Sequence, residues 1–426
     1  MQLPSEQKRS RNPLKRFFGA LGPGLVTGAA DDDPSGIATY SIAGAQFGTQ
    51  FLWLAWFTWP LMMAVQMMCA RIGMMSGHGL AGALSKKFPR PLVVIISIAL
   101  FIANTINIGA NLSGMADAAN LLTGLSENYF VIMFGLLIGW AIVKFRYYQI
   151  ANILKWLALS LFAYIATAFL IHPDWSAISD AALTPRMPTT SEGWSMLVAI
   201  LGTTISPYLF FWQSAQEVEE KKAKGQRMIS SKIYMEKHEL VDRMIDVSAG
   251  TFLSNIVMFF IIVTTAFTLH KHGLTNISTA KEAAEALRPL AGEWTMALYT
   301  LGIVSVGLLA IPTLAGSSAY AFAEIFNWHH GLDEKLKNAE SFYAIIIISV
   351  FCGIGFQFLD INPMKALYWS AIINGLIAPF IMVGILVVAG NHRIMRHHES
   401  SLFALVIVGF ATLVMFAAAI AMFYFS

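Results

Sequence analysis

The sequence predicts an all-α polytopic membrane protein. Of its 426 residues, 56% are hydrophobic and only 12% are charged, whereas soluble proteins carry about 25% charged residues. The apolar residues fall in runs of roughly 20, which is the length of helix that crosses a ~30 Å hydrocarbon core. We therefore expect the lipid bilayer to surround most of this chain.

The composition also excludes several classes of protein. The 28 Lys and Arg against 25 Asp and Glu leave a net charge of +3, which is too weak for a nucleic-acid-binding face. Cys69 and Cys352 lie in separate apolar runs and form no CxxC pair. Because no catalytic His/Cys cluster, nucleophile elbow or phosphate-binding glycine loop occurs, we expect neither enzymatic activity nor a cofactor.

Eleven runs bounded by charges, Pro or Gly are candidate membrane spans. They lie near residues 21–45, 49–74, 92–122, 128–145, 151–171, 193–217, 245–269, 294–325, 341–358, 363–389 and 401–425. The basic N-terminal stretch lacks the cleavage site of a signal peptide. The expected organisation is a cytoplasmic segment (1–20), helices one to five (21–172), an extracytoplasmic loop (173–192), helices six to ten (193–390, with a cytoplasmic loop at 218–244), and a cytoplasmic loop with helix eleven (391–426).

The distribution of basic residues orients these spans, because cytoplasmic loops are enriched in Lys and Arg. With the N-terminus inside, 23 of the 28 Lys and Arg fall on the inner side. The outer side keeps only Arg186, Lys271, Lys281, Arg288 and Lys365. This predicts a cytoplasmic N-terminus and an extracytoplasmic C-terminus, in a bacterial inner membrane. An error of one span would move the C-terminus inside. The polar segment between spans six and seven indicates a loop with a short amphipathic helix at the membrane surface.

The first span is interrupted in its middle by the sequence ADDDPSG. A charged side chain at bilayer depth costs ~2.5–3.5 kcal/mol, so three carboxylates at Asp31–Asp33 cannot face lipid. Pro34 removes a backbone donor and disfavours helix at the residue before it. We therefore expect the helix to unwind around Asp33–Gly36 and to free backbone carbonyls for a cation, as in discontinuous transporter helices.

The sixth span is interrupted in the same way. Gly202, Thr203 and Thr204 precede Ser206-Pro207 halfway along it. Spans one and six would each begin a half of five helices, and interrupted helices at corresponding positions indicate a binding site between inverted repeats. The alternative is that each Pro only kinks its helix for packing.

The residues at the two interruptions favour a hard divalent cation. Asp33 is the expected anchor, with Asp31 and Asp32 beside it and Ser206 with freed carbonyls opposite. Carboxylate, hydroxyl and carbonyl oxygens suit Mg²⁺, Mn²⁺ or Ca²⁺. No Cys, His or Met adjoins either interruption, so a soft-metal site is not expected.

At these residues the chain resembles the natural-resistance-associated macrophage protein (NRAMP) family of divalent-metal transporters. The resemblance begins at GPGLVTGAADDDPSGIAT, continues through RIGMMSGHGLAGAL and LGTTISPYLFFWQS, and ends weakly at INPMKALYWSAIINGLIAPF. It implies a LeuT-type fold with two inverted five-helix repeats and an eleventh helix. The family's Asp-Pro-Gly-Asn and Met-Pro-His correspond here to Asp33-Pro34-Ser35-Gly36 and Ser206-Pro207-Tyr208.

The departures from the family pattern suggest an NRAMP-related outlier with an altered metal site. Asp33 keeps the family's aspartate, whereas Gly36 replaces its asparagine ligand and Ser206 its methionine. Thr203 falls where the family offers a backbone carbonyl. In span ten, Ala371 replaces a polar ligand, and Asn374 lies one turn further on. The expected metal-site residues are Asp33, Gly36, Thr203, Ser206, Asp32 and Asn374. A roomier site of this kind suits an ion that keeps part of its water shell, such as Mg²⁺.

The groups that relay protons in the family are also replaced. Asn111 and Gly114 stand at its two acids in span three, and Tyr208 stands at its histidine. Asp117 is the sole acid left in that span, where it either supports coupling alone or makes a structural bond to a neighbouring helix. Glu217, at the inner end of span six, either lines an inner vestibule or lies at a solvated helix end.

The expected function is transport of divalent cations, Mg²⁺ or Mn²⁺, by alternating access with weak or no proton coupling. The alternative is a sodium-coupled carrier of amino acids or similar solutes, although Asp31–Asp33 would repel a substrate carboxylate. The expected partners are the divalent ion as substrate and the lipid bilayer, with no nucleic acid, and we expect a monomer.

Overall fold

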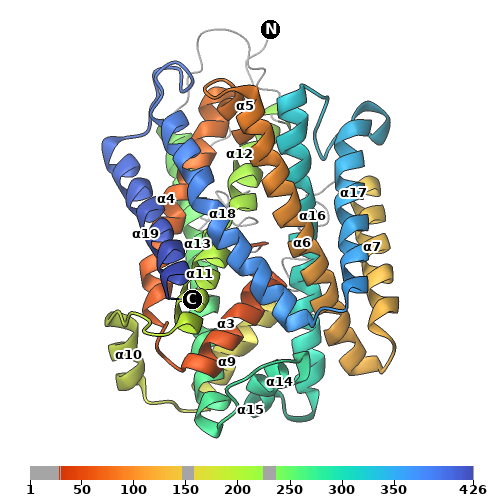
Figure 1. The fold of residues 1–426 in the computed structure, drawn as a ribbon, viewed down its shortest axis with the longest axis vertical. Coiled ribbons are helices and arrows are strands. Elements are labelled where there is room, and N and C mark those ends of the chain that lie inside the picture. Colours follow the sequence, from red (N-terminus) through yellow and green to blue (C-terminus); the bar gives the residue numbers. More distant parts are fainter. Residues whose placement is uncertain (1–27, 29, 146–157, 224–236, 426) are drawn as a thin grey trace, which may run out of the picture.

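The computed structural model describes residues 28, 30–145, 158–223 and 237–425. Within these residues, nine helices are long and apolar enough to cross a membrane. The first and fifth expected spans are represented there by shorter helices, and the residues next to them lie outside the described part. The predicted all-helical, multi-span architecture is confirmed (Figure 1).

The described part of the first half contains a short helix after an interruption, followed by long helices. Its helices are α3 (Pro34–Phe47), α4 (Trp53–Ser76), α5 (Leu80–Ser85), α6 (Arg90–Thr123), α7 (Glu127–Lys144), the 3-10 turn η1 (Ala158–Leu161) and α9 (Phe162–Leu170). The predicted spans agree with α4, α6 and α7 to within four residues at each end.

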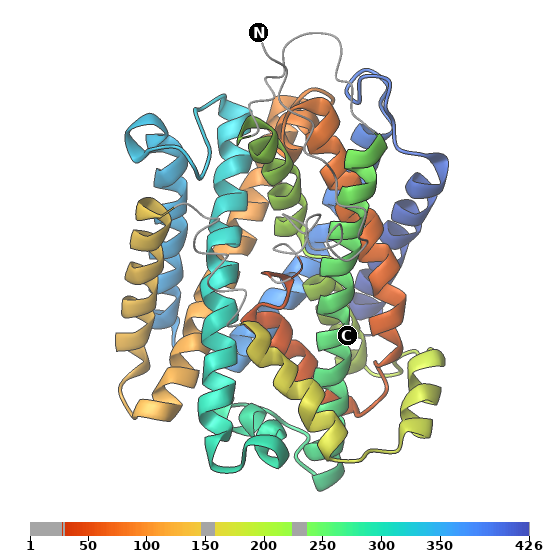
Figure 2. The same ribbon diagram turned by 180° about the vertical axis from the view of Figure 1, so that it is seen from behind.

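The second half repeats this pattern with a divided helix followed by long ones. Its helices are α11 (Ser191–Thr204), α12 (Pro207–Ala223), α13 (Lys237–Thr268), α16 (Thr295–Phe326), α17 (Glu340–Phe356), α18 (Pro363–Ala389) and α19 (Leu402–Tyr424). Short helices α10 (Trp175–Leu183), α14 (Ala280–Ala284) and α15 (Arg288–Ala291) lie in the connections. Figures 1 and 2 place these three at one end of the molecule and α5 at the other.

Two polar connections differ from expectation. The loop expected at 173–192 contains α10, which Asp174 caps by accepting from the N–H groups of Ser176 and Ala177. The loop expected at 218–244 is shortened, because α12 continues to Ala223 and α13 begins at Lys237. Where the structure describes the expected surface helix, it forms the first turns of α13. Residues 224–236 lie outside the described residues.

Close backbone approaches between glycines and neighbouring helices hold α3 in the centre of the molecule. A Cβ at Gly44 would come within 1.9 Å of the Thr265 hydroxyl on α13, and a Cβ at Gly28 would come within 2.4 Å of the Gly250 backbone. A Cβ at Gly307 on α16 would come within 2.3 Å of the Met115 sulfur and 3.3 Å of Pro34. The interruption before α3 is thus enclosed by α6, α13 and α16.

Candidate functional site

Asp33 caps the N-terminus of α3. Its backbone is extended, and its Oδ1 accepts from the Gly36 N–H at 2.8 Å and from the Ser35 hydroxyl at 2.6 Å. Pro34 occupies the first helical position, where its missing N–H costs nothing. The helix is therefore interrupted at Asp32–Asp33, slightly earlier than the expected Asp33–Gly36. Gly36 lies in the first turn of α3, where its N–H is bound to Asp33.

The second oxygen of Asp33 accepts from two asparagines on α6. Nδ2 of Asn111 lies 3.1 Å and Nδ2 of Asn107 lies 3.3 Å from Oδ2. The Ser370 hydroxyl on α18 lies 3.2 Å from Oδ1 of Asn107. All four side chains are buried, so α3, α6 and α18 meet at a polar centre inside the molecule. Asn107 and Asn111 are absent from the predicted ligand set, although the repeated asparagines along α6 are a signal in the sequence.

The second interruption lies where the sequence places it, between Thr204 at the end of α11 and Pro207 at the start of α12. The Ser206 hydroxyl lies 2.8 Å from the Gly202 carbonyl and 2.7 Å from the Thr203 carbonyl. It can donate to one of these carbonyls at a time, although we expected both to be free, and its oxygen lone pairs can still accept a cation. The Thr203 hydroxyl lies 3.0 Å from the Tyr40 hydroxyl, which joins α11 to α3.

Asn374 lies next to a very close approach between α11 and α18. A Cβ at Gly202 would come within 2.1 Å of the Ala371 carbonyl oxygen and 2.4 Å of the Gly375 nitrogen. Asn374 is 2% exposed. It makes no direct hydrogen bond to Asp33 among the described residues, so the structure does not join these two expected ligands directly.

Asp31 and Asp32 are turned toward α13. The Ser254 hydroxyl lies 2.7 Å from Oδ2 of Asp31 and 3.0 Å from Oδ1 of Asp32. One hydroxyl proton serves only one of these acceptors at a time, and Oδ1 of Asp31 has no hydrogen-bond partner in the described part of the chain. The two residues are 1% and 5% exposed. Burying both as anions is costly without a cation or protons to offset their charge.

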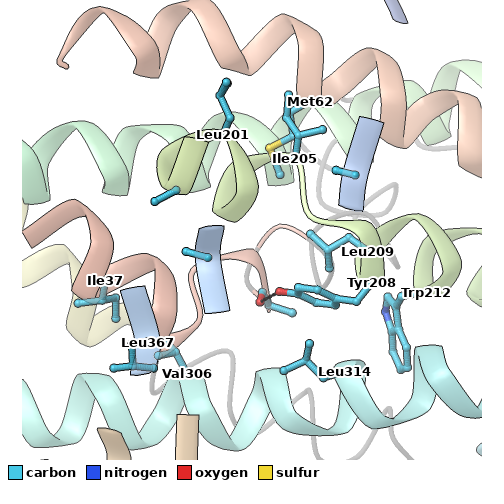
Figure 3. Packing of buried hydrophobic residues seen from close by; sticks show 14 of the residues in the cluster. Ile37, Met62, Leu201, Ile205, Tyr208, Leu209, Trp212, Val306, Leu314 and Leu367 are labelled. Carbon is cyan, nitrogen blue, oxygen red and sulfur yellow. Dashed lines mark hydrogen bonds between the residues drawn. The ribbon is translucent and has the colours of Figure 1, made fainter. Parts of the chain in front are cut away.

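Tyr208 connects the two interruptions. Its hydroxyl donates to the Ala30 carbonyl at 2.9 Å, across the space between α12 and the residues before α3. Figure 3 shows its ring among apolar side chains that include Leu209, Leu314 and Trp212, and all three are fully buried. Tyr208, which the resemblance aligns with the family's histidine, therefore makes a hydrogen bond that joins the two interruptions.

Gly114 and Asp117, the other residues considered from the resemblance for a proton relay, also make structural contacts. A Cβ at Gly114 would come within 2.8 Å of Leu367, so this glycine lets α6 pack closely against α18. Oδ2 of Asp117 accepts from the Ala280 N–H at 3.0 Å, at the start of α14. Of the two roles left open for Asp117, the structure shows the structural bond.

Glu217 belongs to a largely buried ion-pair network in the C-terminal half of α12. Its Oε1 lies 2.7 Å from Nε of Arg243, and Nη1 of Arg243 lies 2.7 Å from Oδ2 of Asp246. Glu220 is a further partner of Arg243. The side chain of Glu217 is 2% exposed. It is therefore neither a solvated helix end nor an open vestibule wall in this conformation.

The central site has few charged groups that could converge on a metal. Within the described residues, no group of three His, Cys, Asp or Glu side chains could hold a metal ion between them. Oxygen atoms of Asp33, Asn107, Asn111, Ser206 and Thr203 are the donors near the two interruptions. Such a donor set fits a hard cation that retains water molecules.

The protein has two helices interrupted at matching positions, with buried carboxylates between them. This arrangement is typical of polytopic membrane proteins of the secondary-transporter type. The family model described as "Natural resistance-associated macrophage protein-like" matches residues 24–425. The chain therefore belongs to the Nramp family, whose relatives reported below are transporters and not enzymes.

Similar proteins agree with this assignment. The "Divalent metal cation transporter MntH" of Yersinia pestis (strain Pestoides F) is 27% identical over 322 residues, covering 72% of this chain and 74% of that protein. MntH of Deinococcus radiodurans is 25% identical over 397 residues, covering 90% and 84%.

Solved structures show the same fold. The Eremococcus coleocola manganese transporter superposes with a TM-score of 0.73 at 17% identity, covering 97% of this chain and 88% of that one. Mhp1, a nucleobase-cation-symport-1 family transporter, superposes with a TM-score of 0.51 at 14% identity, covering 90% and 81%. The predicted LeuT-type architecture is confirmed.

Proposed function

We propose that this protein transports divalent metal cations across the membrane by alternating access, with Asp33 as the main cation anchor. The observation that carries the proposal is the position of Asp33, buried at an interrupted helix and surrounded by donors from α6. Membership of the Nramp family and the names of the relatives support the same substrate class.

The proposed ligands combine direct and water-mediated contacts. Asp33 and Ser206 would contact the ion or its water shell. Asp32, Thr203 and Asn374 would lie around that water shell. Gly36 would contribute only space and a backbone group.

Asn111 is an additional proposed ligand. Its Oδ1 has no hydrogen-bond partner among the described residues. Rotation of the amide would present this oxygen to a cation in place of the nitrogen that now binds Asp33.

The test of the anchor is Asp33→Ala in the full-length protein reconstituted into liposomes. Saturable divalent-metal uptake should be lost because the carboxylate that caps α3 is removed, while the circular dichroism spectrum stays helical. Asp117→Ala is a matched control, since that acid binds α14 and not the central site. Normal uptake by a folded Asp33→Ala protein would refute the assignment.

The proposed ion preference follows from the donor types. A site with oxygen donors and Ser206 in place of a thioether should accept Mg²⁺ and Mn²⁺ and distinguish them poorly. Mn²⁺ uptake should fall as Mg²⁺ is added in excess, and Ser206→Met should weaken this competition by Mg²⁺. If excess Mg²⁺ leaves Mn²⁺ uptake of the wild-type protein unchanged, the hard-cation proposal is wrong.

We further propose weak or absent coupling to protons. Asn111, Gly114 and Tyr208 have structural contacts and do not titrate near neutral pH in ordinary surroundings. Transport would then follow the ion gradient and the membrane potential, worth ~4.6 kcal/mol per divalent ion at 100 mV, which is twice the single-charge value. A pH-sensitive dye inside proteoliposomes should report no acidification linked to metal entry at a clamped potential. Acidification in proportion to metal entry would overturn this proposal.

The orientation of the chain in the membrane is also part of the proposal. The charge distribution supports a cytoplasmic N-terminus and an extracytoplasmic C-terminus, with the two repeats arranged as expected from the sequence. The test is thiol labelling of single cysteines, Lys87→Cys or Lys281→Cys, in a protein whose two native cysteines are replaced by alanine. The first should react only from the cytoplasmic side and the second only from outside, and the reverse pattern would refute the orientation.

A further inference from the structure

A pocket lies where α3 and α13 end, at the opposite end of α3 from Asp33. Its volume is about 610 Å³, within the ~300–1,000 Å³ range of pockets that hold organic ligands. Three segments line it: the end of α3 with the residues after it, the end of α13, and the stretch that follows α10. The lining side chains used below are Phe47, Arg186, Met187, Phe267, His270 and Lys271.

The pocket concentrates positive charge. Two of the five Lys and Arg predicted to lie on the outer side, Arg186 and Lys271, line it. No Asp or Glu occurs among the described residues that line it. Arg186 pairs with Asp180 at 3.2 Å, but the two side chains are 53% and 66% exposed. Such an exposed pair is weak, so Arg186 can exchange this partner for a bound anion.

His270, which lines the pocket, is fixed to the end of α3. Its Nδ1 lies 2.8 Å from the Ala45 carbonyl near the end of α3. Gly48 has a φ of +59°, and a Cβ there would come within 3.2 Å of the imidazole ring. Glycine therefore allows the chain to turn sharply while the ring packs against it. His270 and its neighbour Lys271 are therefore held against the turn that follows α3.

Apolar side chains also line the pocket, near the level where the apolar span of α13 ends. They are Phe47, Met187, Ala266 and Phe267, and they lie beside the polar Thr49, Gln50 and Thr189. The apolar span that includes α13 runs from Glu239 to His272. Met187 is 60% exposed, and Leu183 at the end of neighbouring α10 is 78% exposed. Exposed apolar groups next to cationic groups are typical of the boundary between hydrocarbon and lipid headgroups.

We infer that this pocket binds the phosphate headgroup of an anionic phospholipid. Arg186 and Lys271 contact the phosphate, because Arg and Lys are the side chains suited to its charge and oxygen acceptors. Met187 and Phe267 contact the part of the acyl chains next to the headgroup. The volume is too large for a bare phosphate ion alone and fits a headgroup with its glycerol. This inference is independent of the proposed cation transport.

The test compares lipids and variants of the full-length protein in detergent. Thermal unfolding midpoints are measured with added short-chain phosphatidylglycerol, phosphatidylcholine, glycerol phosphate or inorganic phosphate. The wild-type protein should be stabilised by phosphatidylglycerol more than by the other three compounds. Arg186→Ala with Lys271→Ala should weaken phosphatidylglycerol binding about 30-fold, which corresponds to ~1 kcal/mol for each basic group near an anionic lipid.

The matched control removes two outer basic residues that do not line the pocket. Lys281→Ala with Lys365→Ala changes the net charge equally and should leave the lipid effect unchanged. Thr189→Glu, which adds a negative charge to the lining without removing a residue that binds, should also abolish the preference for phosphatidylglycerol. Thr189→Glu provides an independent test of the pocket if the Arg186→Ala, Lys271→Ala protein is unstable.

Three results would overturn the inference. Equal stabilisation by phosphatidylcholine would show that charge is not recognised. Equal stabilisation by inorganic phosphate or glycerol phosphate would assign the pocket to a soluble anion. An equal loss of stabilisation by phosphatidylglycerol in both double variants would show that only the overall charge of this face matters.

Discussion

Replacing Gly202 by alanine tests how closely α11 must approach α18 for the central site to form. The added Cβ would lie 2.1 Å from the Ala371 carbonyl oxygen and 2.4 Å from the Gly375 nitrogen. Favourable contacts begin near ~3.5 Å, so the two helices would have to separate by about 1 Å. Both obstructing atoms belong to the backbone, so a change of rotamer cannot relieve the clash.

The expected magnitude is the difference between two opposing effects. Overpacking costs ~1–3 kcal/mol, whereas alanine in place of glycine within a helix contributes up to ~1 kcal/mol of stability. We therefore expect Gly202→Ala to lower the free energy of unfolding by up to ~2 kcal/mol. It should also lower metal uptake per folded molecule, because α11 carries Thr203 away from α18.

The assay is thermal unfolding in detergent together with uptake into proteoliposomes. Gly139→Ala on α7 is the matched control. Apart from the backbone of its own helix and its chain neighbours, no atom of the described residues lies within 4 Å of a Cβ at that position. It should keep uptake and leave the unfolding midpoint unchanged or raise it. A Gly202→Ala protein as stable and active as Gly139→Ala would refute the reasoning, since the close contact would then have no consequence.

Three further predictions concern charged groups away from the central site. Arg243→Ala should lower the free energy of unfolding by ~3–5 kcal/mol, because it leaves buried carboxylates without their cation. Lys222→Ala should lower it by less than ~1 kcal/mol, since the Lys222 side chain is half exposed. Desolvation, with the nearby charges of Lys86 and Arg396, lowers the pKa of His78 to about 4. As the pH drops, the unfolded chain therefore takes up this proton before the folded protein does, and the free energy of unfolding should fall between about pH 6.5 and pH 4. His78→Gln should reduce this fall. A pH profile of stability that is the same in the variant and the wild type would contradict the prediction. Asp117→Ala should speed hydrogen exchange in α14, whose first N–H it binds, and should not alter proton movement during metal uptake.

The sequence by itself determined the features that depend on local chemistry. Hydropathy predicted the spans, since any helix that crosses lipid needs a long apolar run. Pro34 and Pro207 predicted the two interruptions, because a proline lacks its backbone donor wherever the helix is placed. The carboxylates beside Pro34 marked the central site, since charges at that depth must face the protein interior.

Only the tertiary structure decided which side chains meet at that site. Asp33 contacts Asn107 and Asn111 from α6, while Asp31 and Asp32 turn to Ser254 on α13. These pairings depend on how each helix is rotated about its axis. Hydropathy does not specify that rotation where a helix is apolar on all sides, because lipid and protein neighbours then favour the same residues. Close approaches such as that of Gly202 to α18 set the rotation instead, and they exist only between helices distant in the sequence.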